Sequence, residues 1–276
     1  MTLEIRLTTP ARLDEALRLP ADAIGIGQEG CLAKLPDVAT LRAAFDRIRA
    51  AGRAGVLVAP IAWPRSADAL LERLRQVAAD GPLTIAVNDV GTALALAREL
   101  PSEVELVAGL ALTRARPHSG EPDAGPPPPA LDTGLLELLR RHRVTAVEID
   151  TETSFDPTDD RWQVRQLVGV TPVGYARSCP TARQHRTGPP GCDTLCDTPY
   201  TITAHQRWQL NHGHREPVPA NTVRPTLTVW GNAVYRPATT EATASYRILD
   251  ARWHTPDQLT ATVHALSGDV TVPAGR

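Results

Sequence analysis

Three of the four cysteines in the sequence lie within one short segment, and the four together could bind a single metal centre. Twelve residues separate Cys179 from Cys192 and three separate Cys192 from Cys196, whereas Cys31 stands far upstream. Four thiolates held tetrahedrally select zinc or an iron–sulfur cluster over harder cations. A site of this kind requires a fold that brings Cys31 to the other three.

The cysteine spacing leaves several interpretations open. Structural zinc usually shows two short cysteine pairs, and only Cys192 and Cys196 have that spacing, which favours an iron–sulfur cluster over zinc. Disulfides are not expected, because the sequence starts without a secretory leader and is long enough to need no covalent staple. The cysteines could also be unrelated thiols that share a surface loop of a reduced protein.

The elements that must position these thiols follow a repeated β–α pattern. Short apolar runs alternate with amphipathic stretches through the first half of the chain, which is typical of parallel strands joined by helices. We expect strands at 3–8, 23–26, 55–59, 83–87, 105–108, 145–149 and 167–174, helices at 10–17, 36–51, 66–79, 89–100, 131–142 and 256–266, and β-structure at 225–235 and 245–249. The pattern predicts an α/β fold of the (β/α)8 TIM-barrel type, irregular at its C-terminal end, with residues 1–276 in a single domain.

Two segments depart from this pattern. Residues 116–130 are rich in proline and glycine and are expected to form a loop, either a passive insertion or a lid. Residues 175–197 form the cysteine-bearing loop, in which Pro189, Pro190 and Gly191 favour a turn. Because this loop follows the strand at 167–174 directly, we expect it at the carboxyl ends of the barrel strands.

Loops that follow the strands of a parallel barrel share one face, and active sites lie there. An acid inside the barrel, as Glu148 would be if its face points inward, needs a partner because unpaired burial is costly. The residues expected at this mouth are Cys31, Asn88, Asp89, Thr113, Glu148 and Cys179.

The cysteine segment GYARSCPTARQHRTGPPGCDTLCD resembles the signature of the U32 (collagenase-like) peptidase family, and its spacing is similar to that of the UbiV branch. Three upstream stretches resemble family motifs in the same order: IGIGQEGC at 24–31, VNDVG at 87–91 and LVAGLALT at 106–113. The resemblance covers most of the chain and is weak after Tyr200. Two positions depart from the family pattern, since Val170 and Thr113 replace a histidine and an asparagine.

The resemblance implies a 4Fe-4S protein of the UbiU/UbiV type, a subunit of an oxygen-independent hydroxylase. Such an enzyme would act on an aromatic biosynthetic intermediate and take its oxygen from prephenate, and the chain would form a heterodimer with a second, UbiU-like family member. The implied cluster ligands are Cys31, Cys179, Cys192 and Cys196. Asn88, Asp89, Tyr175 and Arg183 fall on family motif positions and, with Thr113 and Glu148, are the candidate substrate-binding residues. An arginine among them suits a carboxylated donor.

Other functions stay open. The chain could be a non-catalytic accessory subunit that carries a cluster or zinc and stabilises a catalytic family partner. It could also be a peptidase or an RNA-base hydroxylase of the same family, although no set of peptidase residues can be assigned.

Composition and the remaining motifs narrow the classes of partner. A formal charge of −2 and a pI near 6.4 provide no overall attraction to nucleic acid or anionic membranes. No apolar run is long enough to span a bilayer, and we expect a cytoplasmic protein. The GxGxxG sequence at 25–30 lacks the following helix and ribose-binding acid of a dinucleotide site, so its glycines are expected to turn the backbone beside Cys31.

Overall fold

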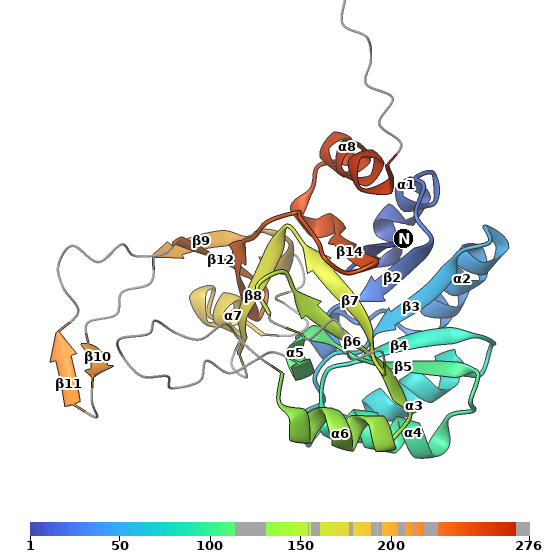
Figure 1. Ribbon diagram of the computed structural model, residues 1–276, viewed down its shortest axis with the longest axis horizontal. Helices are drawn as coiled ribbons and strands as arrows, with labels where there is room; N and C mark the ends of the chain where they lie inside the picture. Colours follow the sequence, from blue (N-terminus) through green and yellow to red (C-terminus); the bar gives the residue numbers. More distant parts are fainter. Residues whose placement is uncertain are drawn as a thin grey trace, which may run out of the picture.

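The computed structural model describes residues 1–113, 131–153, 155, 161–176, 179–188, 192, 195–203, 208–211, 214–217 and 226–268. Eight parallel strands form a closed barrel, which confirms the predicted fold class (Figure 1). Its strands are β1 (Thr2–Leu7), β2 (Ala23–Gly27), β3 (Ala54–Val58), β4 (Leu83–Val87), β5 (Val104–Ala108), β6 (Val144–Asp150), β7 (Gln163–Val168) and β14 (Tyr246–Asp250). β1 pairs with both β2 and β14, and β14 pairs with β7, so the last strand closes the ring.

Helices follow the strands and pack on the outside of the barrel. The described helices of the barrel region are α1 (Leu13–Leu17), α2 (Val38–Ala50), α3 (Ala67–Ala78), α4 (Val90–Glu99), α5 (Leu110–Thr113), α6 (Thr133–Arg141) and α8 (Pro256–Ser267), with 3-10 turns η1 (Pro10–Arg12), η2 (Leu32–Lys34) and η5 (Ala251–Trp253). Asp37, Asp89 and Asp132 cap three of the longer helices by accepting backbone N–H bonds. None of the described helices has the length and apolar character needed to cross a bilayer.

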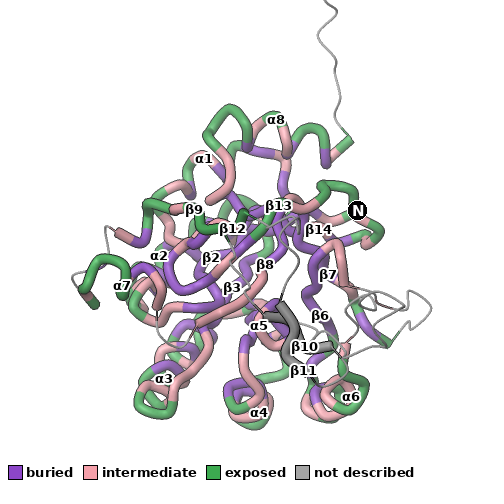
Figure 2. Tube along the Cα trace, turned by 90° about the vertical axis from the view of Figure 1, so that its left-hand side faces the viewer, coloured by how far each residue is buried: buried purple, intermediate pink, exposed green. Residues whose placement is uncertain are grey.

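Successive side chains of each barrel strand point alternately outward and inward, which divides the core into two layers. In β1, Leu3, Ile5 and Leu7 join the apolar core shared with the surrounding helices, while Glu4 and Arg6 lie on the opposite face, inside the barrel. Figure 2 shows this arrangement as buried barrel strands inside helices whose outer sides are exposed. The interior of this barrel is therefore partly charged.

The predicted strand at 167–174 is wrong as a single element. The chain leaves the barrel at Gly169, whose φ of 83° ends β7, and continues as β8 (Val170–Tyr175) in a different sheet. That sheet is antiparallel, in the order β8, β13 (Ala233–Pro237), β12 (Thr226–Trp230) and β9 (Tyr200–Thr203), and it lies beside the barrel (Figure 1). The irregularity expected near the C-terminal end is thus an insertion between the seventh and eighth barrel strands.

The insertion carries the three clustered cysteines. Its other described elements are α7 (Pro180–Gln184), η4 (Leu195–Asp197) and a hairpin of β10 (Trp208–Asn211) and β11 (His214–Pro217). The chain then returns through β14 to complete the barrel. The proline-rich segment 116–130 and parts of the cysteine-bearing loop 175–197 lie outside the described residues.

Candidate metal centre and its surroundings

A tight turn in the inserted sheet joins the early cysteine to the insertion. Asn232, in the turn between β12 and β13, donates a hydrogen bond from Nδ2 to the carbonyl of Gly30 at 2.5 Å. A Cβ on Gly30 would collide with the side chain of Asn232, so any other residue there would force that side chain to move. Since Cys31 is the next residue, this contact ties its backbone to the inserted sheet.

The same turn also binds the segment around Cys179. The hydroxyl of Thr181 donates to the carbonyl of Gly231 at 2.8 Å, and the backbone N–H of Ala176 donates to the carbonyl of Asn232 at 2.8 Å. Cys179 itself caps α7, because its Sγ accepts the N–H of Ala182 at 3.4 Å. Thus one turn holds the segments of Cys31 and Cys179 close together.

Cys192 and Cys196 are joined by a backbone hydrogen bond, and the residue after Cys196 contacts the same region. The N–H groups of Leu195 and Cys196 both donate to the carbonyl of Cys192 at 3.1 Å. Asp197 forms an ion pair with Lys34 at 3.2 Å, and Lys34 lies three residues after Cys31. The last two cysteines are therefore linked to the Cys31 segment by a contact of their own.

The thiols lie within electrostatic reach of one another. The pKa of Cys196 is raised to about 12, chiefly by burial and then by neighbouring Cys192, with smaller contributions from Cys179 and Cys31, while Lys34 acts in the opposite direction. Burial also raises the pKa of Cys31, with smaller contributions in the same direction from Cys179 and Cys192, while nearby backbone N–H groups lower it. All four cysteines are free thiols rather than disulfides.

The chemistry of this donor set fits a soft metal centre. Within the described part of the chain, no three His, Cys, Asp or Glu side chains are arranged to hold a metal ion as they stand. Four sulfurs from two segments, with backbone N–H groups near them, are nevertheless the donors that zinc and iron–sulfur clusters use. Metal binding would deprotonate these thiols, and for Cys31 and Cys196 it would act against the rise in pKa that burial causes.

Glu148 points into the barrel, where Arg6 neutralises it. Arg6 donates to both carboxylate oxygens of Glu148, at 3.0 and 2.6 Å, and also to Glu4 at 2.8 Å. Tyr246 completes the group by donating its hydroxyl to Glu4 at 3.0 Å. Gly25 leaves the necessary room, because a Cβ there would lie 2.5 Å from a Glu4 oxygen. Each buried charge in this group has a charged partner, which makes its burial tolerable.

Three other candidate substrate-binding residues are engaged by the fold. Asn88 donates to the carbonyl of Ala59 at 2.8 Å and accepts the N–H of Ala111 at 2.9 Å. Asp89 caps α4 and also accepts the N–H of Ala62 at 2.9 Å. Thr113 donates to the backbone carbonyl of Glu148. These side chains organise the carboxyl ends of β3 to β6.

Two buried oxygen atoms lack a hydrogen-bond partner among the described residues: the hydroxyl of Tyr175 and Oε2 of Glu29. Burial raises the pKa of both groups, and the proximity of Glu29 adds to the rise for Tyr175. Arg6 lies 3.5 Å and Arg252 4.0 Å from the Glu29 carboxylate. Glu29 and Tyr175 thus form part of a polar group at the inner side of the mouth.

Arg183 lies apart from these residues. It is exposed on α7 and lines a cavity with Tyr200, Ile202 and Val234 of the inserted sheet. The other candidate residues do not line that cavity.

The sequence reasoning missed Arg6 and Arg252. Arg6 lies in a strand whose sequence, LEIRL, places two charges on one face of an apolar run, and that pattern could have indicated an internal ion pair. Arg252, in η5 directly after β14, had no comparable signal. Besides its neighbour Asp250, it contacts Tyr235 and Gln28, and Gln28 is more than two hundred residues away in the sequence.

No protein-family model matches this sequence, and no curated protein matches it. Among solved structures, the fold is similar to the one described as "The Structure of the U32 Peptidase Mk0906", with 14% sequence identity and a TM-score of 0.46. The alignment covers 91% of this chain and 93% of that one.

Proposed function

We propose that this chain is an iron–sulfur protein of the U32 family, similar to the UbiV branch, with a 4Fe-4S cluster on Cys31, Cys179, Cys192 and Cys196. The observation that supports this proposal best is the turn at Gly231–Asn232, which bonds to the segments of both Cys31 and Cys179. A random set of surface thiols would need no such convergence of two segments far apart in the sequence.

The cluster would support an oxygen-independent hydroxylation. When bound, a 4Fe-4S cluster supplies one-electron redox chemistry. We propose that the chain acts with a second, UbiU-like family member on an aromatic biosynthetic intermediate, with prephenate as the oxygen donor. In this role the chain's own residues hold the ligand thiols, exclude water from Cys192 and Cys196, and keep Lys34 close to the last ligand.

A second function, that of an accessory subunit, is favoured by the hydrogen bonds at the mouth. Asn88, Asp89, Thr113 and Glu148 are bonded to neighbouring elements, which makes them well suited to maintaining the fold. A subunit that carries a cluster or zinc for a catalytic partner would need no free catalytic side chain.

Metal and sulfide analysis of protein purified without oxygen tests the cluster. We expect about four iron and about four sulfide per chain and a broad visible absorption. Cys31→Ala should lose iron as completely as Cys192→Ala, because both thiols would bind the same centre. Gly188→Ala is the control, since a Cβ there meets nothing within 4 Å. One zinc without sulfide, or full iron retention in Cys31→Ala, would contradict the proposed cluster.

A reconstitution experiment tests the accessory function and the need for this chain. Product hydroxylation would be measured anaerobically with this chain alone, with a UbiU-like partner alone, and with both. Activity that requires both chains is expected. Activity of this chain alone would contradict the accessory function, and undiminished activity of the partner alone would contradict any need for this chain. Protease activity removed by one specific side-chain substitution would instead support a peptidase.

A further inference from the structure

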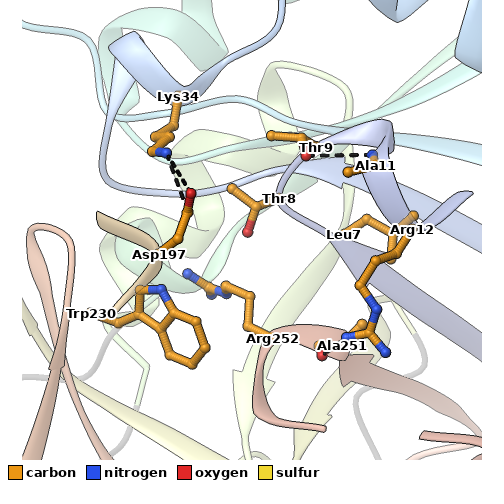
Figure 3. A pocket seen from close by; sticks show the side chains of 10 residues that line it. All are labelled: Leu7, Thr8, Thr9, Ala11, Arg12, Lys34, Asp197, Trp230, Ala251 and Arg252. Carbon is orange, nitrogen blue, oxygen red and sulfur yellow. Dashed lines mark hydrogen bonds and ion pairs between the residues drawn. The ribbon is translucent and has the colours of Figure 1, made fainter. Parts of the chain in front are cut away.

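A cavity lies at the carboxyl end of the barrel, between β1, η2, η4, β12 and η5. Its volume is about 430 Å³, which is in the size range of pockets for small organic ligands. Three cationic side chains line it, opposed by one acidic side chain: Arg12, Lys34 and Arg252 against Asp197. Figure 3 shows these residues around the space, with the Lys34–Asp197 ion pair on one side of it.

Arg252 is held so that one end of its guanidinium can meet a ligand. Its Nε and Nη2 donate to Asp250 at 2.8 and 2.5 Å, and Nη2 also reaches the Tyr235 hydroxyl at 3.2 Å. Nη1 has only a long contact in the described structure, 3.4 Å to Gln28, so it retains donor capacity. A guanidinium fixed on one side and available on the other is a suitable anchor for a carboxylate.

Thr8 provides a second polar group in the same wall. Its Oγ1 is buried and has no hydrogen-bond partner among the described residues, although Thr8 lines the cavity. In Figure 3 this hydroxyl points into the space toward Arg252. Because an unpaired buried hydroxyl is unfavourable, a bound acceptor would satisfy it.

The remaining walls suit a flat ring. Trp230 lines one side of the cavity, and Leu7, Ala11 and Ala251 supply apolar surface. Trp253 packs edge-on against Trp230 with ring centroids 5.0 Å apart, which fixes the indole in place.

A second, smaller cavity adjoins this one on the side of the cysteine segments. This smaller cavity of about 40 Å³ shares Thr8, Lys34, Trp230 and Arg252 with the larger one and is also lined by Cys196. A ligand in the larger cavity would therefore lie on the same side of the barrel as the thiol of Cys196.

We propose that this cavity binds a small aromatic carboxylate. The ring lies against Trp230, while the carboxylate accepts hydrogen bonds from Nη1 of Arg252 and from the hydroxyl of Thr8. The assignment of this cavity as the substrate site rests on the proposed function and specifies its substrate. Binding of an aromatic carboxylate in the cavity requires only the cavity itself. Lys34 adds positive charge near the ligand while its own partner, Asp197, stays at the rim.

Isothermal titration of the purified protein with three probes tests this assignment. The probes are 4-hydroxybenzoate, 4-hydroxybenzamide with the same ring but no charge, and cyclohexanecarboxylate with the charge but no aromatic ring. We expect 4-hydroxybenzoate to bind about tenfold more tightly than either analogue, because each analogue lacks one interaction. Equal affinity for the uncharged amide, or no binding of 4-hydroxybenzoate at millimolar concentration, would overturn the proposal.

Variants locate the site. Thr8→Val preserves the shape of the side chain and should lower the affinity for 4-hydroxybenzoate about fivefold. Trp230→Leu should lower the same affinity about tenfold or more. Thr201→Val, on the exposed strand β9, is the matched control and should change nothing. Unchanged affinity in Thr8→Val and Trp230→Leu would place the ligand elsewhere and refute the proposal. Iron and sulfide are measured on the same samples to distinguish the proposed ligand site from the proposed cluster. A protein that contains the cluster but does not bind 4-hydroxybenzoate would refute the ligand site alone. A protein that binds 4-hydroxybenzoate but contains zinc without sulfide would refute the cluster alone.

Discussion

At the scale of single residues, the charges inside the barrel form a closed group that depends on Arg6. Its guanidinium contacts Glu4 and Glu148, both fully buried, and Glu29 lies nearby. These acids raise the pKa of Arg6 far above its usual value against the opposing effect of burial, so it stays charged. Removing this one cation would leave Glu4 and Glu148 without the guanidinium that pairs with them, in a site that excludes water.

Arg6→Met is therefore expected to destabilise the barrel by about 3–5 kcal/mol, measured as the free energy of unfolding in urea. Arg47→Met is the control, because Arg47 pairs with Asp14 on the surface, where loss of an ion pair costs about 0–1 kcal/mol. Equal, small losses of stability in both variants would contradict the dependence of the interior acids on Arg6.

The residue types of the site could be predicted from the sequence, but their partners could not. The cysteine spacing indicated a shared centre, and the helix expected at 89–100 is present as α4, which Asp89 caps. Whether Glu148 points inward could not be decided, because its orientation depends on the register of β6 against β5 and β7. The role of Thr8 depends on a wall assembled from segments more than two hundred residues apart, such as Trp230 and Arg252.

At the scale of elements, the turn at Gly231–Asn232 positions the cysteine segments. The barrel strands from β1 to β6 were predicted to within one or two residues, because their apolar runs and the helix caps between them are local signals. The end of β7 was not predicted, because Val168 and Val170 both continue an apolar run and only Gly169 marks the change of sheet. Antiparallel pairing of β8 with β13 joins residues about sixty positions apart, and no local pattern reveals it.

Gly30→Ala tests this element directly. The added methyl group would collide with the Asn232 side chain and push the turn away from Cys31, so we expect most of the iron to be lost while the barrel stays folded by circular dichroism. Gly30→Ala combined with Asn232→Gly should restore part of the iron, because it removes the colliding side chain. Full iron occupancy in Gly30→Ala would show that the turn does not position the ligands.

At the scale of the whole molecule, the barrel and the insertion are stabilised by different means. β14 pairs with β1 and β7 after the insertion, so the ring closes through barrel strands and not through the inserted sheet. The apolar core is concentrated between the barrel strands and their helices, whereas the described cysteine segments are fixed by a small number of hydrogen bonds and one ion pair. Stability should therefore differ between the two parts.

If the proposed centre is bound, its removal should loosen the insertion and leave the barrel intact. In Cys192→Ala protein, or after chelation and oxidation, we expect proteases to cut first between residues 176 and 203, because the thiols no longer join these segments through a common centre. The two fragments should remain associated, since β14 of the second fragment is inserted between β1 and β7 of the first. Limited proteolysis followed by native mass measurement checks this result, with the metal-loaded protein as the control. Cleavage that begins within β1 to β6, or fragments that separate at once, would mean that the centre also maintains the barrel.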